Sequence, residues 1–60
     1  MKNWKVQLLL YHESYNGHDL CDGWVTYHLQ AANAKSALKK AMKNISGPQW
    51  VRNSCVFEEK

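Results

Sequence analysis

The sequence contains few residues of the kinds that build disulfide-rich or membrane proteins. Its two cysteines, Cys21 and Cys55, are too few for the disulfide framework of small secreted domains. We expect both to remain thiols, with a disulfide or a thiol site as the alternatives. The longest apolar run, within "VQLLLY" near the amino terminus, is too short for a signal peptide or a membrane span. We therefore expect a cytoplasmic protein that makes no membrane contact.

The chain also lacks the size and the motifs of an enzyme. Sixty residues allow one domain, 1–60, and a domain this small buries only about 60% of the surface that its unfolded chain exposes. A deep active site is therefore not expected, and no Ser-His-Asp order, glycine-rich phosphate loop or pair of carboxylates at a plausible separation supports catalysis. With 45% hydrophobic residues and seven aromatic ones, the chain should nevertheless fold. We expect no catalytic activity and no cofactor.

Negative charge is absent from a long segment. No aspartate or glutamate occurs between residues 23 and 57, and the net charge of the chain is +3. A segment without acidic residues favours an anionic partner, either a nucleic acid or an acidic protein. A solvated basic surface is the alternative. The cations of this segment are Lys35, Lys39, Lys40, Lys43 and Arg52.

Apolar residues alternate over residues 4–12 and 24–31, which predicts two strands. The segment "QWVRNSCVFE", residues 49–58, predicts a third strand, whose irregular alternation indicates a bulge near Asn53. Between the second and third strands the apolar period changes to that of a helix. We expect Asn33 to cap the start of this helix and "SGP" at residues 46–48 to end it, with Gly47 as a left-handed cap. The apolar stripe comprises Ala34, Ala37, Leu38, Ala41, Met42 and Ile45.

The element order predicts an α+β fold. A strand, a strand, a helix and a strand (ββαβ) make a crossover between the second and third strands, so these two strands run in the same direction. The first strand is the most apolar, and we expect it in the middle. The prediction is a three-stranded, mainly antiparallel sheet of order 2-1-3, with one helix packed on one face.

The stretch "YNGHDLCDGW", residues 15–24, predicts the end of a hairpin. Asn16-Gly17 is the strongest short signal for a two-residue type I′ turn, and it sets Leu8 opposite Val25 and Trp4 opposite Leu29. Gly23 then indicates a bulge or bend in the second strand. The same register places His12 opposite Cys21, which leaves a metal or thiol site at His12, His18 and Cys21 as a minor hypothesis.

Two surfaces are candidates for binding a partner. The sheet face away from the helix is expected to expose aromatic and apolar residues, which is typical of an interface. It would meet another macromolecule, form a homodimer or stack on single-stranded nucleic acid. The outer helix face carries a lysine row that could contact phosphates or acidic residues. The first surface comprises Leu9, Tyr11, Trp24, His28, Trp50 and Val56 with Lys5 and Arg52, and the second comprises Lys35, Lys39, Lys40 and Lys43.

The layout suggests a class of function. A hairpin, the strand-to-helix passage "QAANAKSALKKAMKN" and a final strand resemble the layout of small phage-encoded proteins, including anti-CRISPR inhibitors. This resemblance implies a compact, non-catalytic binder that occupies a protein surface. We therefore expect a phage or mobile-element protein that modulates a host protein or a protein-nucleic-acid complex. Direct nucleic-acid binding is the alternative.

Overall fold

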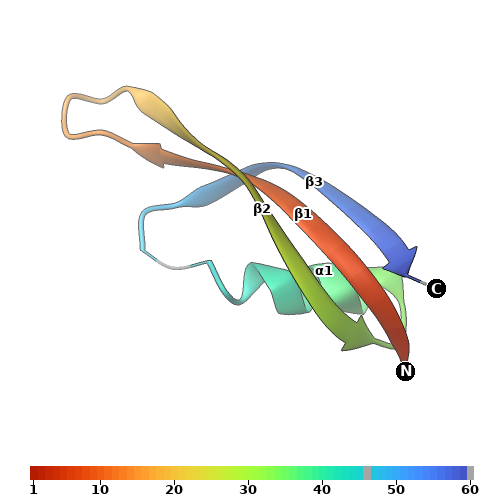
Figure 1. Ribbon diagram of the computed structural model, residues 1–60. Coiled ribbons are helices and arrows are strands. Elements are labelled where there is room, and N and C mark those ends of the chain that lie inside the picture. Colours follow the sequence, from red (N-terminus) through yellow and green to blue (C-terminus); the bar gives the residue numbers. More distant parts are fainter. Residues whose placement is uncertain (46, 60) are drawn as a thin grey trace.

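Three strands and one helix make up the computed structural model, which describes residues 1–45 and 47–59. They are β1 (Lys2–Glu13), β2 (Asp19–Ala31), α1 (Ala34–Met42) and β3 (Trp50–Glu59). The strands form one sheet of order β2-β1-β3, and both outer strands run antiparallel to β1 (Figure 1). The predicted α+β fold and strand order are confirmed.

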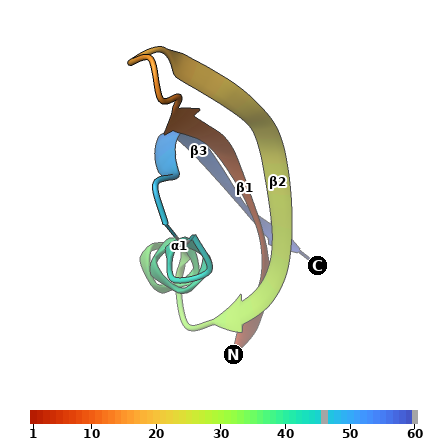
Figure 2. The ribbon, with the colours of Figure 1, turned by 90° about the vertical axis from the view of Figure 1, so that its left-hand side faces the viewer.

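The helix covers one face of the sheet, and the sheet bends around it (Figure 2). Between the two layers lies a small core that consists of Val6, Leu8 and Leu10 from β1, Ala31 from β2, and Ala37 and Ala41 from α1. The opposite, convex face has no described element over it. We call it the open face, and it carries the side chains of β1 residues 5, 7, 9 and 11 and of their partners on β2 and β3.

Helix α1 begins as predicted and ends earlier than predicted. The Asn33 side chain accepts a hydrogen bond from the Ser36 backbone N–H at 2.9 Å, which satisfies a free donor of the first turn. The helix ends at Met42 with Lys43 as its C-cap. Gly47 has a positive φ of 66°, but it follows the helix end by several residues, and Ser46 of the "SGP" segment lies outside the described residues. In the described part of the chain, no helix is long and apolar enough to cross a membrane.

Only part of the predicted helix stripe is in the core. Ala37 and Ala41 are fully buried, and Leu38 and Ile45 pack against the core. Met42, however, is 46% exposed, and Ala34, the first helical residue, is also exposed. At about 100° per residue, Met42 points about 120° away from the line between the two alanines. The predicted burial of Ala34 and Met42 is therefore wrong, because Ala34 lies in the exposed first turn and Met42 points to the side of Ala37 and Ala41.

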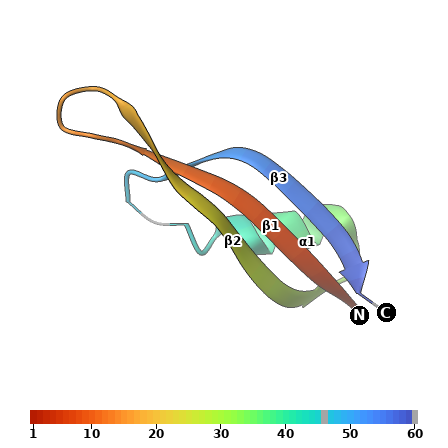
Figure 3. The same ribbon diagram turned by 45° about the horizontal axis from the view of Figure 1, so that its top comes forward.

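The β1–β2 hairpin extends beyond the rest of the molecule (Figures 1 and 3). Strand β3 begins at Trp50, opposite Tyr11, so residues 12–20 form a two-stranded extension that we call the hairpin arm. The molecule measures 43 × 16 × 13 Å, and its radius of gyration is 12.7 Å, whereas a compact chain of this length would have about 10 Å. The arm therefore lies outside the region that the helix covers.

The end of the arm differs from the predicted two-residue turn. Pairing follows the predicted register from Trp4 opposite Leu29 to Leu9 opposite Trp24, and then a bulge at Asp22 sets Tyr11 opposite Cys21. The extra residue leaves a three-residue loop, in which the Gly17 N–H donates to the Ser14 carbonyl at 3.0 Å. Gly17 has a φ of 84° and no non-glycine residue has a positive φ among those described, so a type I′ turn is wrong.

A second bulge, in β3, changes which side chains face the core. Leu9 lies opposite Asn53 and Leu10 lies opposite Val51, so Arg52 is the additional residue and the bulge predicted near Asn53 is confirmed. Beyond this bulge the alternation is reversed. Val56 packs against the core, and the prediction that it lies on the open face is wrong.

Candidate interaction surface

Aromatic side chains from all three strands gather on the open face. Tyr11 of β1 and Trp50 of β3 are direct partners, and their rings stack with centroids 5.2 Å apart and planes 28° apart. Trp24 of β2 lies opposite Leu9, one step further along the sheet. Trp24 is 50% exposed and Trp50 is 36% exposed. The strand register thus brings together the three predicted aromatic residues of the site.

Two cations of the open face lie over aromatic rings. The Arg52 guanidinium is 5.4 Å from the Tyr11 ring centroid, and the Lys5 ammonium is 5.1 Å from the Phe57 ring centroid. Such contacts attract the cation electrostatically to the ring face and hold it near the surface. The ion pairs found among the described residues involve neither cation. Both charges are therefore available to an anionic group.

The sequence-based prediction missed Phe57 as a residue of this surface. Phe57 lies opposite Lys5 and is 48% exposed, which is similar to Trp24. The signal was present in the predicted bulge: one extra residue near Asn53 reverses the faces of every later residue in β3. Applying that reversal to residues 54–58 would have exchanged Val56 for Phe57.

His28 belongs to the open face, but it already has a partner. Its Nδ1 lies 2.9 Å from Glu59 Oε1, across β1 from β2 to β3. The two residues also line a shallow hollow at this end of the sheet, together with Asn3, Leu29 and Gln30. His28 therefore lies at the border of the aromatic group, beside a carboxylate.

The predicted lysine row lies on a separate surface. The four lysines Lys35, Lys39, Lys40 and Lys43 are exposed, and they belong to the helix layer, on the covered side of the sheet (Figure 2). Lys40 differs from the others because its Nζ donates to the Gln30 carbonyl at 2.8 Å, at the outer strand β2. The structure therefore places the predicted site residues on two surfaces that face in opposite directions.

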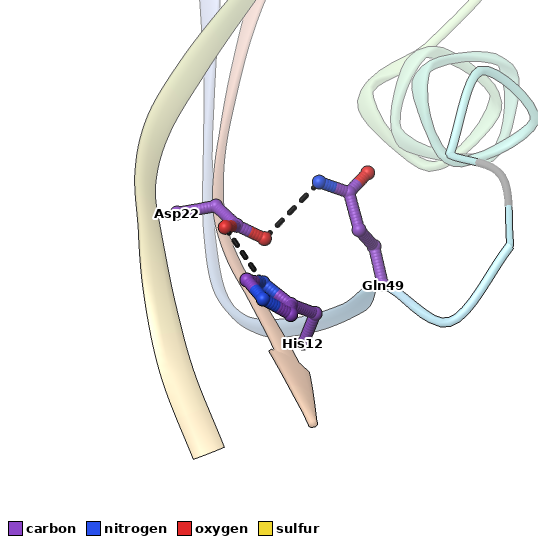
Figure 4. Close-up of polar contacts among 3 residues, drawn as sticks. All are labelled: His12, Asp22 and Gln49. Atoms are coloured by element: carbon purple, nitrogen blue, oxygen red, sulfur yellow. Dashed lines mark hydrogen bonds and ion pairs between the residues drawn. The ribbon is translucent and has the colours of Figure 1, made fainter. Parts of the chain in front are cut away.

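Asp22, the bulged residue of β2, joins the arm to the segment before β3 (Figure 4). Its Oδ1 lies 2.7 Å from His12 Nδ1, and its Oδ2 accepts a hydrogen bond from Gln49 Nε2 at 3.1 Å. The hydrogen bond from His12 is the main cause that lowers the pKa of Asp22 below its ordinary value. This carboxylate, held by two donors, links the base of the arm to the segment before β3.

The same bulge contradicts the pairing on which the metal or thiol hypothesis rested. Cys21 lies opposite Tyr11, while His12 lies opposite Leu20, because Asp22 adds one residue to β2. His12 and Cys21 consequently lie on different faces of the hairpin. In the described part of the chain, no group of three or more His, Cys, Asp or Glu side chains is placed to hold a metal ion.

Comparisons of the chain with protein-family models, curated proteins and solved structures find no match.

Proposed function

We propose that the protein is a non-enzymatic binding protein that docks on a host protein or protein-nucleic-acid complex through the open face. The observation that carries this proposal is the exposure of Trp24, Trp50 and Phe57 on one uncovered face. Trp, Tyr and Arg are the residue types that contribute most to binding energy at interfaces. The basic helix would be a second, separate contact.

The shape of the open face supports binding rather than catalysis. The face is convex (Figure 2), so it offers contact area and does not enclose a substrate away from water. Two copies of a convex face would touch over a small area, whereas stable protein interfaces bury roughly 1,200–2,000 Å². A different macromolecule with a complementary surface is thus a better partner than a second copy of this chain.

The resemblance of the layout to small phage-encoded inhibitors agrees with this proposal. Such proteins act by occupying a surface and need no catalytic group. On this basis, we propose that the chain is a phage or mobile-element protein that modulates a host complex, as anti-CRISPR inhibitors do.

A capture experiment with two matched variants tests the proposal. Trp24 and Leu20 are exposed to a similar extent, 50% and 46%, but Trp24 lies on the open face and Leu20 in the hairpin arm, opposite His12 and outside both proposed contacts. Trp24→Glu and Leu20→Glu therefore introduce the same charge at an exposed apolar position of β2. We expect the wild-type chain and Leu20→Glu to retain a common partner from bacterial lysate, and Trp24→Glu to lose it. Equal capture by both variants, or a purified chain with twice the expected mass in light scattering, would contradict the proposal.

A further inference from the structure

The middle of the open face carries positive charge and no carboxylate. Lys5 and Arg52 lie over the rings of Phe57 and Tyr11. The acidic groups of this side of the sheet flank these cations: Glu13 and Asp19 are paired in the arm, and at the other end Glu59 contacts His28, which is the direct β2 partner of Lys5. A surface with this distribution attracts an anionic ligand to its centre.

The rings on this face are suited to stacking. Trp24, Trp50 and Phe57 expose between 36% and 50% of their surface, and each belongs to a different position along the sheet. Aromatic side chains bind unpaired bases by stacking, and each such contact changes affinity on the order of five- to a hundredfold.

The dimensions and curvature of the face match an extended ligand. From Lys5 to Tyr11 the surface runs along seven residues of β1, which span about 20 Å at the usual rise of a strand. A single strand is flexible enough to follow a convex surface, whereas the bases of a duplex are stacked on one another and cannot reach the rings.

We infer that the open face binds single-stranded nucleic acid, with bases stacked on Trp24, Trp50 and Phe57 and phosphates near Lys5 and Arg52. This inference rests on the proposed function, because it assigns the nucleic-acid part of the host complex to the same surface. Recognition of this kind tolerates many sequences, since every base has a π face.

A titration with labelled oligonucleotides tests the inference. The probes are an oligothymidylate of about twelve nucleotides and the same strand paired with oligoadenylate. We expect the single strand to bind more tightly than the duplex and to quench tryptophan fluorescence. Two to three phosphate contacts predict that affinity falls roughly tenfold between about 50 and 200 mM salt.

Matched variants assign the binding to the open face. We expect Trp24→Ala to weaken binding of the single strand roughly tenfold and Met42→Ala to leave it unchanged. Trp24→Phe keeps an aromatic ring and should retain most of the affinity. A loss in Trp24→Ala alone is then due to the missing ring and not to a folding defect. Lys5→Gln should weaken binding more than Lys39→Gln, although both remove one positive charge.

Three results would overturn the inference: no binding of oligothymidylate at low salt, equal affinity for the duplex, or a loss caused by Lys39→Gln and not by Trp24→Ala. The proposed function fails separately. If oligothymidylate does not bind but a nuclease-resistant partner is still captured through Trp24, only the inference is wrong. If no partner captured from a lysate depends on Trp24, but the binding of oligothymidylate does depend on it, only the proposed docking on a protein is wrong.

Discussion

The covered face and the open face of the sheet use the same strands for different purposes. On the covered face, Val6, Leu8 and Leu10 are almost fully buried against alanines of the helix. On the open face, the neighbouring positions of β1 lie among exposed rings and cations. Because side chains alternate along a strand, a shift of the strand register by one residue would exchange these two sets of side chains. Stability therefore depends on the covered face, whereas the open face is the proposed binding surface, and the two bulges keep the two sets of side chains apart.

The largest expected effect comes from the covered face. Leu8→Ala removes most of a fully buried side chain and should lower the free energy of unfolding by about 2–5 kcal/mol. A domain of this length is stable by only about 3–9 kcal/mol, so Leu8→Val, expected to cost about 1 kcal/mol, is the milder variant. Thr26→Val on the open face is the control and should change stability by less than about 0.5 kcal/mol. Urea unfolding measures all three, and similar losses on both faces would contradict the division.

The second effect concerns the bulge that sets the register of the arm. Gly23 has a φ of 91°, and a Cβ there would meet nothing within 4 Å, so only backbone strain opposes a side chain. Gly23→Ala should lower the free energy of unfolding by about 1–2 kcal/mol, and Gly23→Asn should cost less. Urea unfolding gives the size of the loss, and amide exchange should locate it in residues 10–23. An unchanged stability would mean that β2 pairs without this bulge.

The third effect concerns the start of the helix that covers the sheet. Asn33→Ala removes the hydrogen bond to the Ser36 N–H and should lower the free energy of unfolding by about 1 kcal/mol. Asn33→Asp keeps an acceptor and adds a negative charge near the helix start, where no acidic residue is present in the first turn, so it should be at least as stable as the wild-type chain. Thermal unfolding compares the two variants. Equal losses in both would show that the cap does not contribute.

A smaller effect is expected for stability when the open face is altered. Trp24→Ala should lower the free energy of unfolding by only about 0.2–1 kcal/mol, which is the size of one cross-strand contact with Leu9. The same substitution is expected to weaken binding strongly. Unfolding and titration of one variant therefore separate the roles of the two faces, and a loss of several kcal/mol would show that Trp24 also holds the fold together.

The smallest effect is confined to the base of the arm and depends on pH. The pKa of Asp22 is lowered in the folded chain, chiefly by the hydrogen bond from His12. Its contribution to stability is therefore present above the unfolded pKa of about 3.9 and is lost as the pH falls below that value through the folded pKa. Amide chemical shifts near Asp22 and Gln49 should change in this acidic range. Asp22→Asn should abolish the transition, whereas the core resonances should not move in either protein.

The alternation of apolar residues was sufficient to predict the sheet and much of its register. The pairs Leu8–Val25 and Leu9–Trp24, the strand order and the Asn33 cap all follow from local patterns. The end of the hairpin and the outer half of β3 do not follow from these patterns. A bulge adds one residue to a strand, and the sequence does not show which residue is the added one. The positions of Cys21, Val56 and Phe57 all depend on that choice. The helix end was also misplaced, since Ile45 fits the apolar period and packs against the core, although the helix ends at Met42.

The order of the strands in the sheet has a consequence for how the binding surface is assembled during folding. The β1–β2 hairpin closes over a short loop, whereas β3 must find β1 across more than thirty residues of chain, and such long-range pairing is slow. Strand β3 supplies Trp50, Arg52 and Phe57, so a chain whose hairpin has formed still lacks half of the aromatic group. Docking of β3 should complete the surface last, and brief detachment of this strand would remove it while the hairpin remains intact.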